Sequence, residues 1–163
     1  MSHKDIIVDG ITIEYEGIFN FDELYQHLRK WMDRKHYKFG EFGYKEIKGD
    51  TRSLEIKFGG YRKVDEYVKY VIEAPIELKD LKEVTKKGAK GRFFQGKFKI
   101  IFKGYLVMDY ENKWEKNALT LFLREVYDKY LMGSRIEKME KELKGDVDKL
   151  VDEIKAFLKL LKL

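Results

Sequence analysis

The chain has 163 residues, no cysteine, 15% aromatic residues and a formal net charge of +5. This length fits one domain, so residues 1–163 are expected to form a single unit. The aromatic content excludes a disordered chain, and the lack of cysteine excludes disulfides and cysteine nucleophiles. No apolar run approaches the roughly 20 residues of a membrane span, so we expect a cytoplasmic protein without a transmembrane segment. Charged residues reach 39%, a content typical of thermophilic proteins.

The first predicted elements are a strand and a helix. Residues 11–15 alternate between apolar and polar side chains, which indicates a half-buried strand. The chain is then expected to turn before Asn20. Asn20 and Glu23 have the spacing of a capping box, so a helix is predicted from Phe21 to near His36.

A series of strands is predicted between residues 37 and 110, because apolar and polar residues alternate there in several short runs. A bulge is expected at 40–43, where two glycines break the alternation. Pro75 indicates an edge strand or a second bulge, since proline cannot donate to a ladder. Gly104 is expected to bend or end one strand, with a last strand at 105–110. The connections are short, so the strands are expected to be antiparallel.

From Trp114 the apolar residues recur at helical spacing, which predicts a long C-terminal helix that is kinked or divided near Gly133. Its apolar side is expected to cover the sheet. The predicted fold class is therefore α+β. It consists of a curved antiparallel sheet of about five to seven strands packed on a long C-terminal helix, with a shorter helix after the first strand.

This order of elements resembles the helix-grip architecture of the START-like superfamily, in which a curved sheet wraps a long C-terminal helix. The resemblance covers most of the chain and rests on topology. It implies an enclosed apolar cavity that binds lipids, hormones or polyketides. Two segments, Gly104–Glu115 and Tyr127–Glu137, also resemble a family of small uncharacterised archaeal proteins. This second resemblance implies an archaeal source and no particular activity.

Aromatic residues on the predicted inner faces are candidates to line such a cavity. They are Tyr44, Phe58, Tyr70, Phe94, Phe98, Phe102, Trp114 and Phe122. Ligand cavities are lined mainly by apolar and aromatic side chains. An ordinary packed core has the same composition, and the pattern leaves both interpretations open.

Positive charge is concentrated between Lys79 and Lys103, where nine basic residues accompany two acidic ones. The candidates for binding an anion or nucleic acid are Lys86, Lys87, Lys90, Arg92, Lys97, Lys99 and Lys103. Such a surface would bind RNA, DNA or anionic lipid through salt-sensitive contacts. The same lysines could instead keep a hairpin soluble and protect an edge strand.

No motif predicts catalysis, a metal or a cofactor. His27 and His36 do not have the three- or four-residue spacing of a helical metal site, and no serine has an evident histidine partner. We therefore favour a non-catalytic protein, without excluding an enzyme. The leading hypothesis is a protein that holds an apolar small molecule or lipid between the sheet and the C-terminal helix. The alternative is a basic accessory protein that binds RNA or a ribonucleoprotein through the Lys79–Lys103 face.

Overall fold

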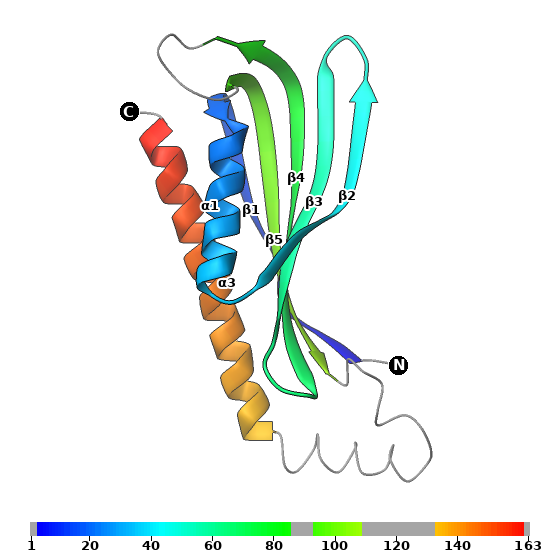
Figure 1. Cartoon of the computed structure of the whole chain (residues 1–163), viewed down its shortest axis with the longest axis vertical. Helices are drawn as coiled ribbons and strands as arrows, with labels where there is room; N and C mark the ends of the chain where they lie inside the picture. Colours follow the sequence, from blue (N-terminus) through cyan, green and yellow to red (C-terminus); the bar gives the residue numbers. More distant parts are fainter. Residues whose placement is uncertain (1–2, 86–92, 109–132, 162–163) are drawn as a thin grey trace.

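The computed structural model describes residues 3–85, 93–108 and 133–161, which form five strands and two helices (Figure 1). In chain order they are β1 (His3–Asn20), α1 (Phe21–Arg34), β2 (Lys38–Lys48), β3 (Arg52–Lys63), β4 (Val68–Val84), β5 (Phe93–Met108) and α3 (Gly133–Leu161). The strands form one antiparallel sheet with the order β1-β5-β4-β3-β2. The predicted α+β class is thus confirmed, with five strands in the described ranges.

Both helices lie on the same side of this sheet. Gly60, Ile72 and Gly104 are register neighbours across β3, β4 and β5, so their side chains share one face. A Cβ atom added to Gly60 would lie 3.1 Å from Sδ of Met32 in α1, and one added to Gly104 would lie 3.1 Å from Cγ2 of Val147 in α3. We call this side the inner face and the opposite side the outer face.

The strand β1 is longer than predicted and runs directly into α1. The expected turn before Asn20 is wrong, because every residue from Thr12 to Asn20 pairs with β5 and the last pair is Asn20–Phe93. The predicted cap is confirmed, since the Asn20 side chain accepts a hydrogen bond from the backbone N–H of Glu23 at 3.3 Å. This bond satisfies one donor at the helix start. The helix ends at Arg34.

The predictions of an edge strand or bulge at Pro75 and of a strand end at Gly104 were wrong. Pro75 lies in β4, an interior strand, and the register with β5 is the same before and after it, from Glu73–Lys103 to Ile76–Ile100. It therefore marks neither an edge nor a bulge. Gly104 does not end its strand either, because β5 continues to Met108. The lack of a Cβ atom at Gly104 instead allows α3 to approach β5 closely.

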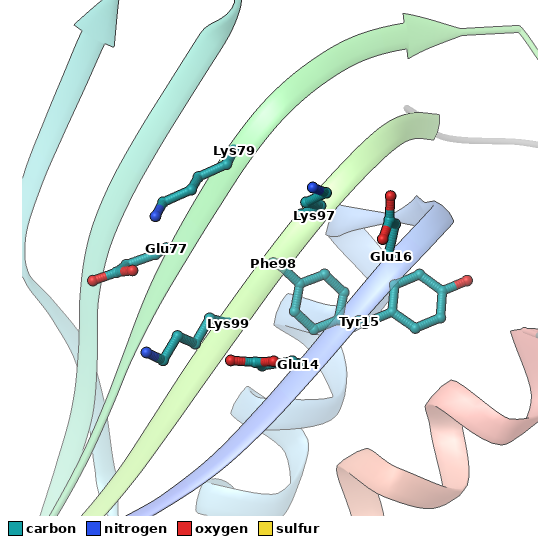
Figure 2. Close-up of a pocket in the computed structure, with 8 residues that line it drawn as sticks. All are labelled: Glu14, Tyr15, Glu16, Glu77, Lys79, Lys97, Phe98 and Lys99. Carbon is teal, nitrogen blue, oxygen red and sulfur yellow. The ribbon is translucent and has the colours of Figure 1, made fainter.

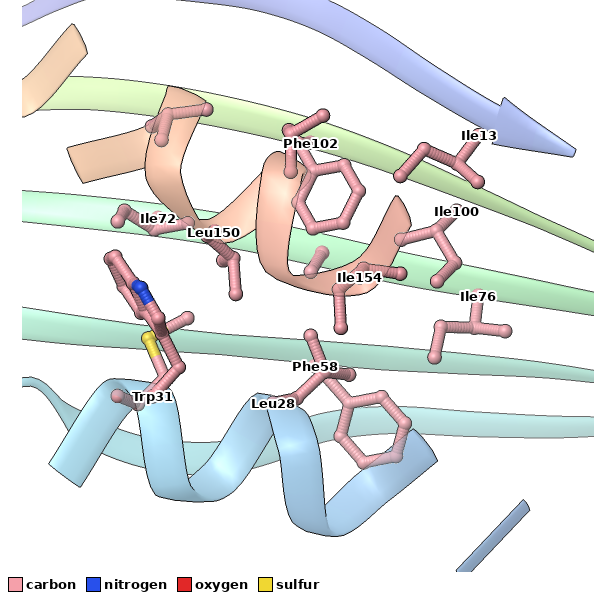
Figure 3. Packing of buried hydrophobic residues seen from close by; sticks show 14 of the residues in the cluster. Ile13, Leu28, Trp31, Phe58, Ile72, Ile76, Ile100, Phe102, Leu150 and Ile154 are labelled. Atoms are coloured by element: carbon pink, nitrogen blue, oxygen red, sulfur yellow. The ribbon is translucent and has the colours of Figure 1, made fainter. Parts of the chain in front are cut away.

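The core lies between the inner face and the two helices (Figure 3). The predicted alternation in β4 is confirmed, since Tyr70, Ile72, Ala74 and Ile76 have no exposed surface. The helices contribute a matching apolar stripe, in which the buried residues are Leu24, Leu28, Trp31, Met32, Met139, Leu143, Val147, Leu150, Val151, Ile154, Phe157 and Leu158. Each large apolar side chain buried in this way stabilises the fold by about 1.5–3 kcal/mol. The predicted helical segment from Trp114 to residue 132 lies outside the described residues.

Candidate functional site

Most of the described cavity candidates are core residues. Phe58, Tyr70, Phe98 and Phe102 are at most 3% exposed and belong to the main apolar cluster. The other four candidates are placed differently: Tyr44 is 56% exposed, Phe94 packs at the rim of the core, and Trp114 and Phe122 lie outside the described residues. Whether the interior holds a ligand therefore remains a prediction.

Around Phe58 the space between α1 and the sheet is filled by other aromatic rings. Phe39 stacks on Phe58 with 5.7 Å between the ring centroids, and Tyr25 lies 5.6 Å from each of these two rings. Phe21 adds a fourth ring at 6.4 Å from Phe58. Close ring pairs of this kind stabilise a core beyond their buried area. For Phe58, the structure therefore shows a packed environment.

A polar cluster on the inner face links α3 to Arg62 of β3 and to Tyr37, which lies directly before β2. The Tyr37 hydroxyl donates to Oδ2 of the buried Asp146 at 2.8 Å. The Arg62 guanidinium lies over the rings of Tyr37 and Tyr70, at 5.3 and 5.0 Å from their centroids. It also pairs with Glu142. We call these five residues the Arg62 cluster.

The Arg62 cluster has two unusual hydroxyl groups. Burial raises the pKa of Tyr37, and the adjacent Asp146 carboxylate raises it further. Burial and the nearby Glu142 charge raise the pKa of Tyr70 to about 12. The Glu142 carboxylate is near the buried Tyr70 hydroxyl but outside hydrogen-bond geometry, so this hydroxyl has no hydrogen-bond partner among the described residues. An unpaired hydroxyl of this kind typically costs about 1–3 kcal/mol.

The described anion candidates lie on the outer face, where glutamates are their neighbours. In the ladder between β1 and β5, Lys97 is paired with Glu16 and Lys99 with Glu14. Across to β4, Lys103 is paired with Glu73, Lys99 also faces Glu77, and Lys97 also faces Lys79. Cross-strand pairs of opposite charge stabilise a sheet slightly and lower its positive potential. The remaining candidates, Lys86, Lys87, Lys90 and Arg92, lie outside the described residues.

Lys97, Lys99 and their neighbour Lys79 line a depression of about 540 Å³ that β1, β4 and β5 form (Figure 2). Its lining residues are Glu14, Tyr15, Glu16, Glu77, Lys79, Lys97, Phe98 and Lys99. The three lysines and three glutamates balance each other in formal charge. Lys79 and Lys97 nevertheless lie side by side in the register of β4 and β5. Lys97 is also paired with Glu16 of β1, whereas Lys79 has no glutamate partner in the ladders.

A second part of the outer face combines aromatic rings with lysines. The ammonium group of Lys69 lies 5.3 Å from the Tyr61 ring centroid, and that of Lys4 lies 3.7 Å from the Tyr105 ring centroid. The Tyr105 hydroxyl donates to Glu73 at 3.3 Å. Our sequence interpretation missed this region, although Lys57 and Tyr61 have the opposite parity to Ile56 and Phe58. That parity alone would have placed them away from the core.

The two histidines with described side chains, His27 and His36, do not form a site. His27 packs against the ring of Phe157 with 4.4 Å between centroids, and its Nδ1 lies 3.7 Å from Glu153 of α3. His36 adopts a left-handed backbone conformation just after α1. In the described ranges, no three histidine or carboxylate side chains are grouped so that they could hold a metal ion.

No protein-family model, curated protein or solved structure matches this chain. Among the described helices, none combines the length and the apolar content needed to cross a membrane.

Proposed function

We propose that this chain is a non-catalytic binding protein that holds RNA on the outer face of its sheet. The observation that carries the proposal is the charge of this face, which lies opposite both described helices. Lysines outnumber glutamates among its ladder residues, which include Lys4, Lys45, Lys57, Lys63, Lys69, Lys79, Lys97, Lys99 and Lys103 against Glu14, Glu16, Glu55, Glu73 and Glu77. A phosphate backbone is attracted to such a surface without any base-specific contact.

The pair of Lys79 and Lys97 is the best starting point for a phosphate. These two residues are paired across β4 and β5, so their ammonium groups repel one another and an anion between them relieves that repulsion. Both side chains are exposed. The segment that joins the two strands carries Lys86, Lys87, Lys90 and Arg92, and in sequence it follows soon after Lys79.

The glutamates of the face limit the expected affinity. Glu14 and Glu16 are paired with Lys99 and Lys97 and cancel part of the field that a phosphate meets. We therefore expect weak binding, with a dissociation constant in the range of roughly 10⁻⁴ to 10⁻⁶ M at physiological salt. The binding should strengthen steeply when the salt is lowered, because each phosphate contact releases counterions.

The test is fluorescence anisotropy with a labelled single-stranded RNA at several salt concentrations. The variant K79Q/K97Q should bind more weakly and reduce the slope of log K against log salt by about 1.4, since each lost contact on a single strand contributes about 0.7. The matched control is K138Q/K149Q, which removes two exposed lysines from α3. Equal affinities and slopes for both variants, or no RNA binding by the natural chain, would refute the proposal.

A second candidate function is the binding of an apolar molecule with one polar group between the sheet and α3, as in helix-grip proteins with a curved sheet. The observation that favours it is the Tyr70 hydroxyl, because a ligand oxygen would supply the missing hydrogen bond. Native mass spectrometry of freshly purified protein should then show added mass, and Tyr70→Phe should reduce its occupancy. A single unliganded mass for the natural chain would speak against this candidate.

A further inference from the structure

Phe42 lies at an irregularity of the edge strand β2. In the pairing with β3, Glu41 faces Phe58 and Gly43 faces Lys57, so Phe42 is the extra residue of a bulge. This bulge was predicted from the two glycines and is confirmed. A bulge changes the direction of a side chain relative to the regular alternation of its strand. The side on which Phe42 lies must therefore be found from its contacts.

The Phe42 ring lies on the outer face, over Gly59. Gly60 faces α1, as shown above, so its neighbour Gly59 faces the opposite side. A Cβ atom on Gly59 would come within 3.0 Å of Cε2 of Phe42. Although the ring covers this glycine, Phe42 is 66% exposed. Among the large apolar residues this is a high value, and it leaves most of the ring open to solvent.

Lysines and a second aromatic ring lie near Phe42 on the outer face. The Lys57 side chain runs along Gly43, the residue after Phe42, since its Cδ lies 3.4 Å from the Cβ position of Gly43. Tyr61, with Lys69 over its ring, is two residues from Gly59 along β3 and on the same face. The outer face therefore offers an exposed ring with cationic groups close by. This combination is typical of proteins that bind single-stranded nucleic acid.

We propose that Phe42 is a stacking platform for an unpaired base of single-stranded RNA, an inference that rests on the function proposed above. Every base has a π-face that can stack on an aromatic ring, and lysines beside the ring attract the phosphates that flank the base. Gly59, which the Phe42 ring covers, is paired with Glu73 of β4. Lys79 lies six residues after Glu73 on the same strand, and this separation corresponds to roughly 20 Å. A strand of about six nucleotides could therefore contact both Phe42 and the Lys79–Lys97 pair.

Phe42 also has a structural role that the test must separate from binding. A Cβ atom at Gly59 would lie only 2.8 Å from the carbonyl oxygen of Ile72, so this position needs glycine, and the Phe42 ring covers the gap. Phe42→Leu keeps an apolar cover but removes the aromatic face. Tyr44→Leu is the matched control, because Tyr44 is 56% exposed on the same strand and its ladder partner Ile56 faces the core.

The experiment measures the affinity of the natural chain, F42L and Y44L for a labelled hexanucleotide RNA and for a duplex RNA of the same sequence. F42L should bind the single strand about tenfold more weakly, which is the loss of one stacked base. Its urea unfolding curve and the affinity of Y44L should equal those of the natural chain. A hexamer that carries 2-aminopurine should lose fluorescence on binding to the natural chain and much less on binding to F42L.

The other outcomes each decide a different question. Salt-dependent RNA binding that is the same in F42L and the natural chain would overturn the stacking role and leave the proposed function intact. Preference for the duplex would also overturn the stacking role. If the chain binds anionic phospholipid vesicles and no RNA at low salt, both the stacking role and the proposed function are wrong.

Discussion

The two faces of this sheet are built from alternate residues of the same strands, yet they serve different purposes. On the inner face of β5, Phe98, Ile100 and Phe102 are buried under the helices. On its outer face, Lys97, Lys99 and Lys103 stand opposite glutamates. Burial of apolar surface stabilises the fold strongly, whereas exposed charge pairs contribute little. Stability therefore constrains the outer face less than the inner face, where the residues must pack against the helices.

The inner face is also not uniformly apolar. The Arg62 cluster introduces a charged side chain and a buried carboxylate between the sheet and α3. A buried polar group must keep its partners, because leaving one unpaired is costly. Apolar packing holds the helix on the sheet at many positions, and we expect the Arg62 cluster to specify where along the sheet α3 binds.

The largest difference between the two faces should appear when core volume is removed. Phe102→Ala should lower the free energy of unfolding by about 3–5 kcal/mol, because it leaves a cavity under α3. Ile101→Ala, one residue earlier on the outer face, should cost about 1 kcal/mol or less. Urea unfolding followed by circular dichroism measures both values. Similar losses in the two variants would show that the outer face is covered as well.

A smaller effect is expected from the buried carboxylate of the Arg62 cluster. Asp146→Ala should cost about 1–3 kcal/mol of unfolding free energy, because the Tyr37 hydroxyl loses its acceptor and Arg62 loses a nearby charge. Asp148→Ala, at an exposed position of the same helix, should change it by about 0.5 kcal/mol or less. If the two variants are equally stable, the cluster does not position α3.

The pH dependence of stability tests the same cluster. The pKa of Tyr37 is raised in the folded chain, so above pH 10 the unfolded chain releases this proton while the folded chain keeps it. The unfolded state then binds fewer protons, and the free energy of unfolding falls by up to about 1.4 kcal/mol per pH unit for this group. At pH values below the ordinary pKa of tyrosine, the stabilising contribution of the Tyr37 hydroxyl is fully present. The slope above pH 10 should therefore be shallower in Tyr37→Phe than in the natural chain, and an unchanged slope would contradict the assignment.

The smallest effect concerns a charge pair of the outer face. A double-mutant cycle of Glu14→Gln and Lys99→Gln should give a coupling energy of about 0.2–1 kcal/mol at low salt and less at high salt. Urea unfolding at two ionic strengths measures it. A coupling above about 2 kcal/mol would mean that this part of the outer face is shielded from water.

Much of the fold could be predicted from local patterns. The Asn20 cap, the helix after it and the buried face of β4 all depend on residues close in sequence. The errors occurred where a distant strand decided the outcome. The residues before Asn20 contain the turn signal of Gly17, but pairing with β5 keeps them extended. Gly104 was expected to bend or end its strand, whereas its role is defined by Val147 of α3, which is 43 residues later in the chain.

The candidate site was less accessible from the sequence than the fold. The parity of β5 indicated which lysines point outward, but the glutamates beside them come from β1 and β4 and could not be assigned without the register. Phe42 lies within the bulge that was predicted at 40–43. Its position over Gly59 depends on a bulge whose effect on side-chain direction cannot be derived from spacing.

The sequence by itself determined the class of the fold, the capped helix after β1 and the division of most strands into an apolar and a polar side. These properties follow from the periods of the helix and the strand, which act over a few residues. Only the tertiary structure decided that β4 and β5 are interior strands, that lysines and glutamates are neighbours on the outer face, and that Phe42 is exposed there. Strand order and register result from contacts between residues far apart in sequence, and such contacts leave little trace in a local pattern.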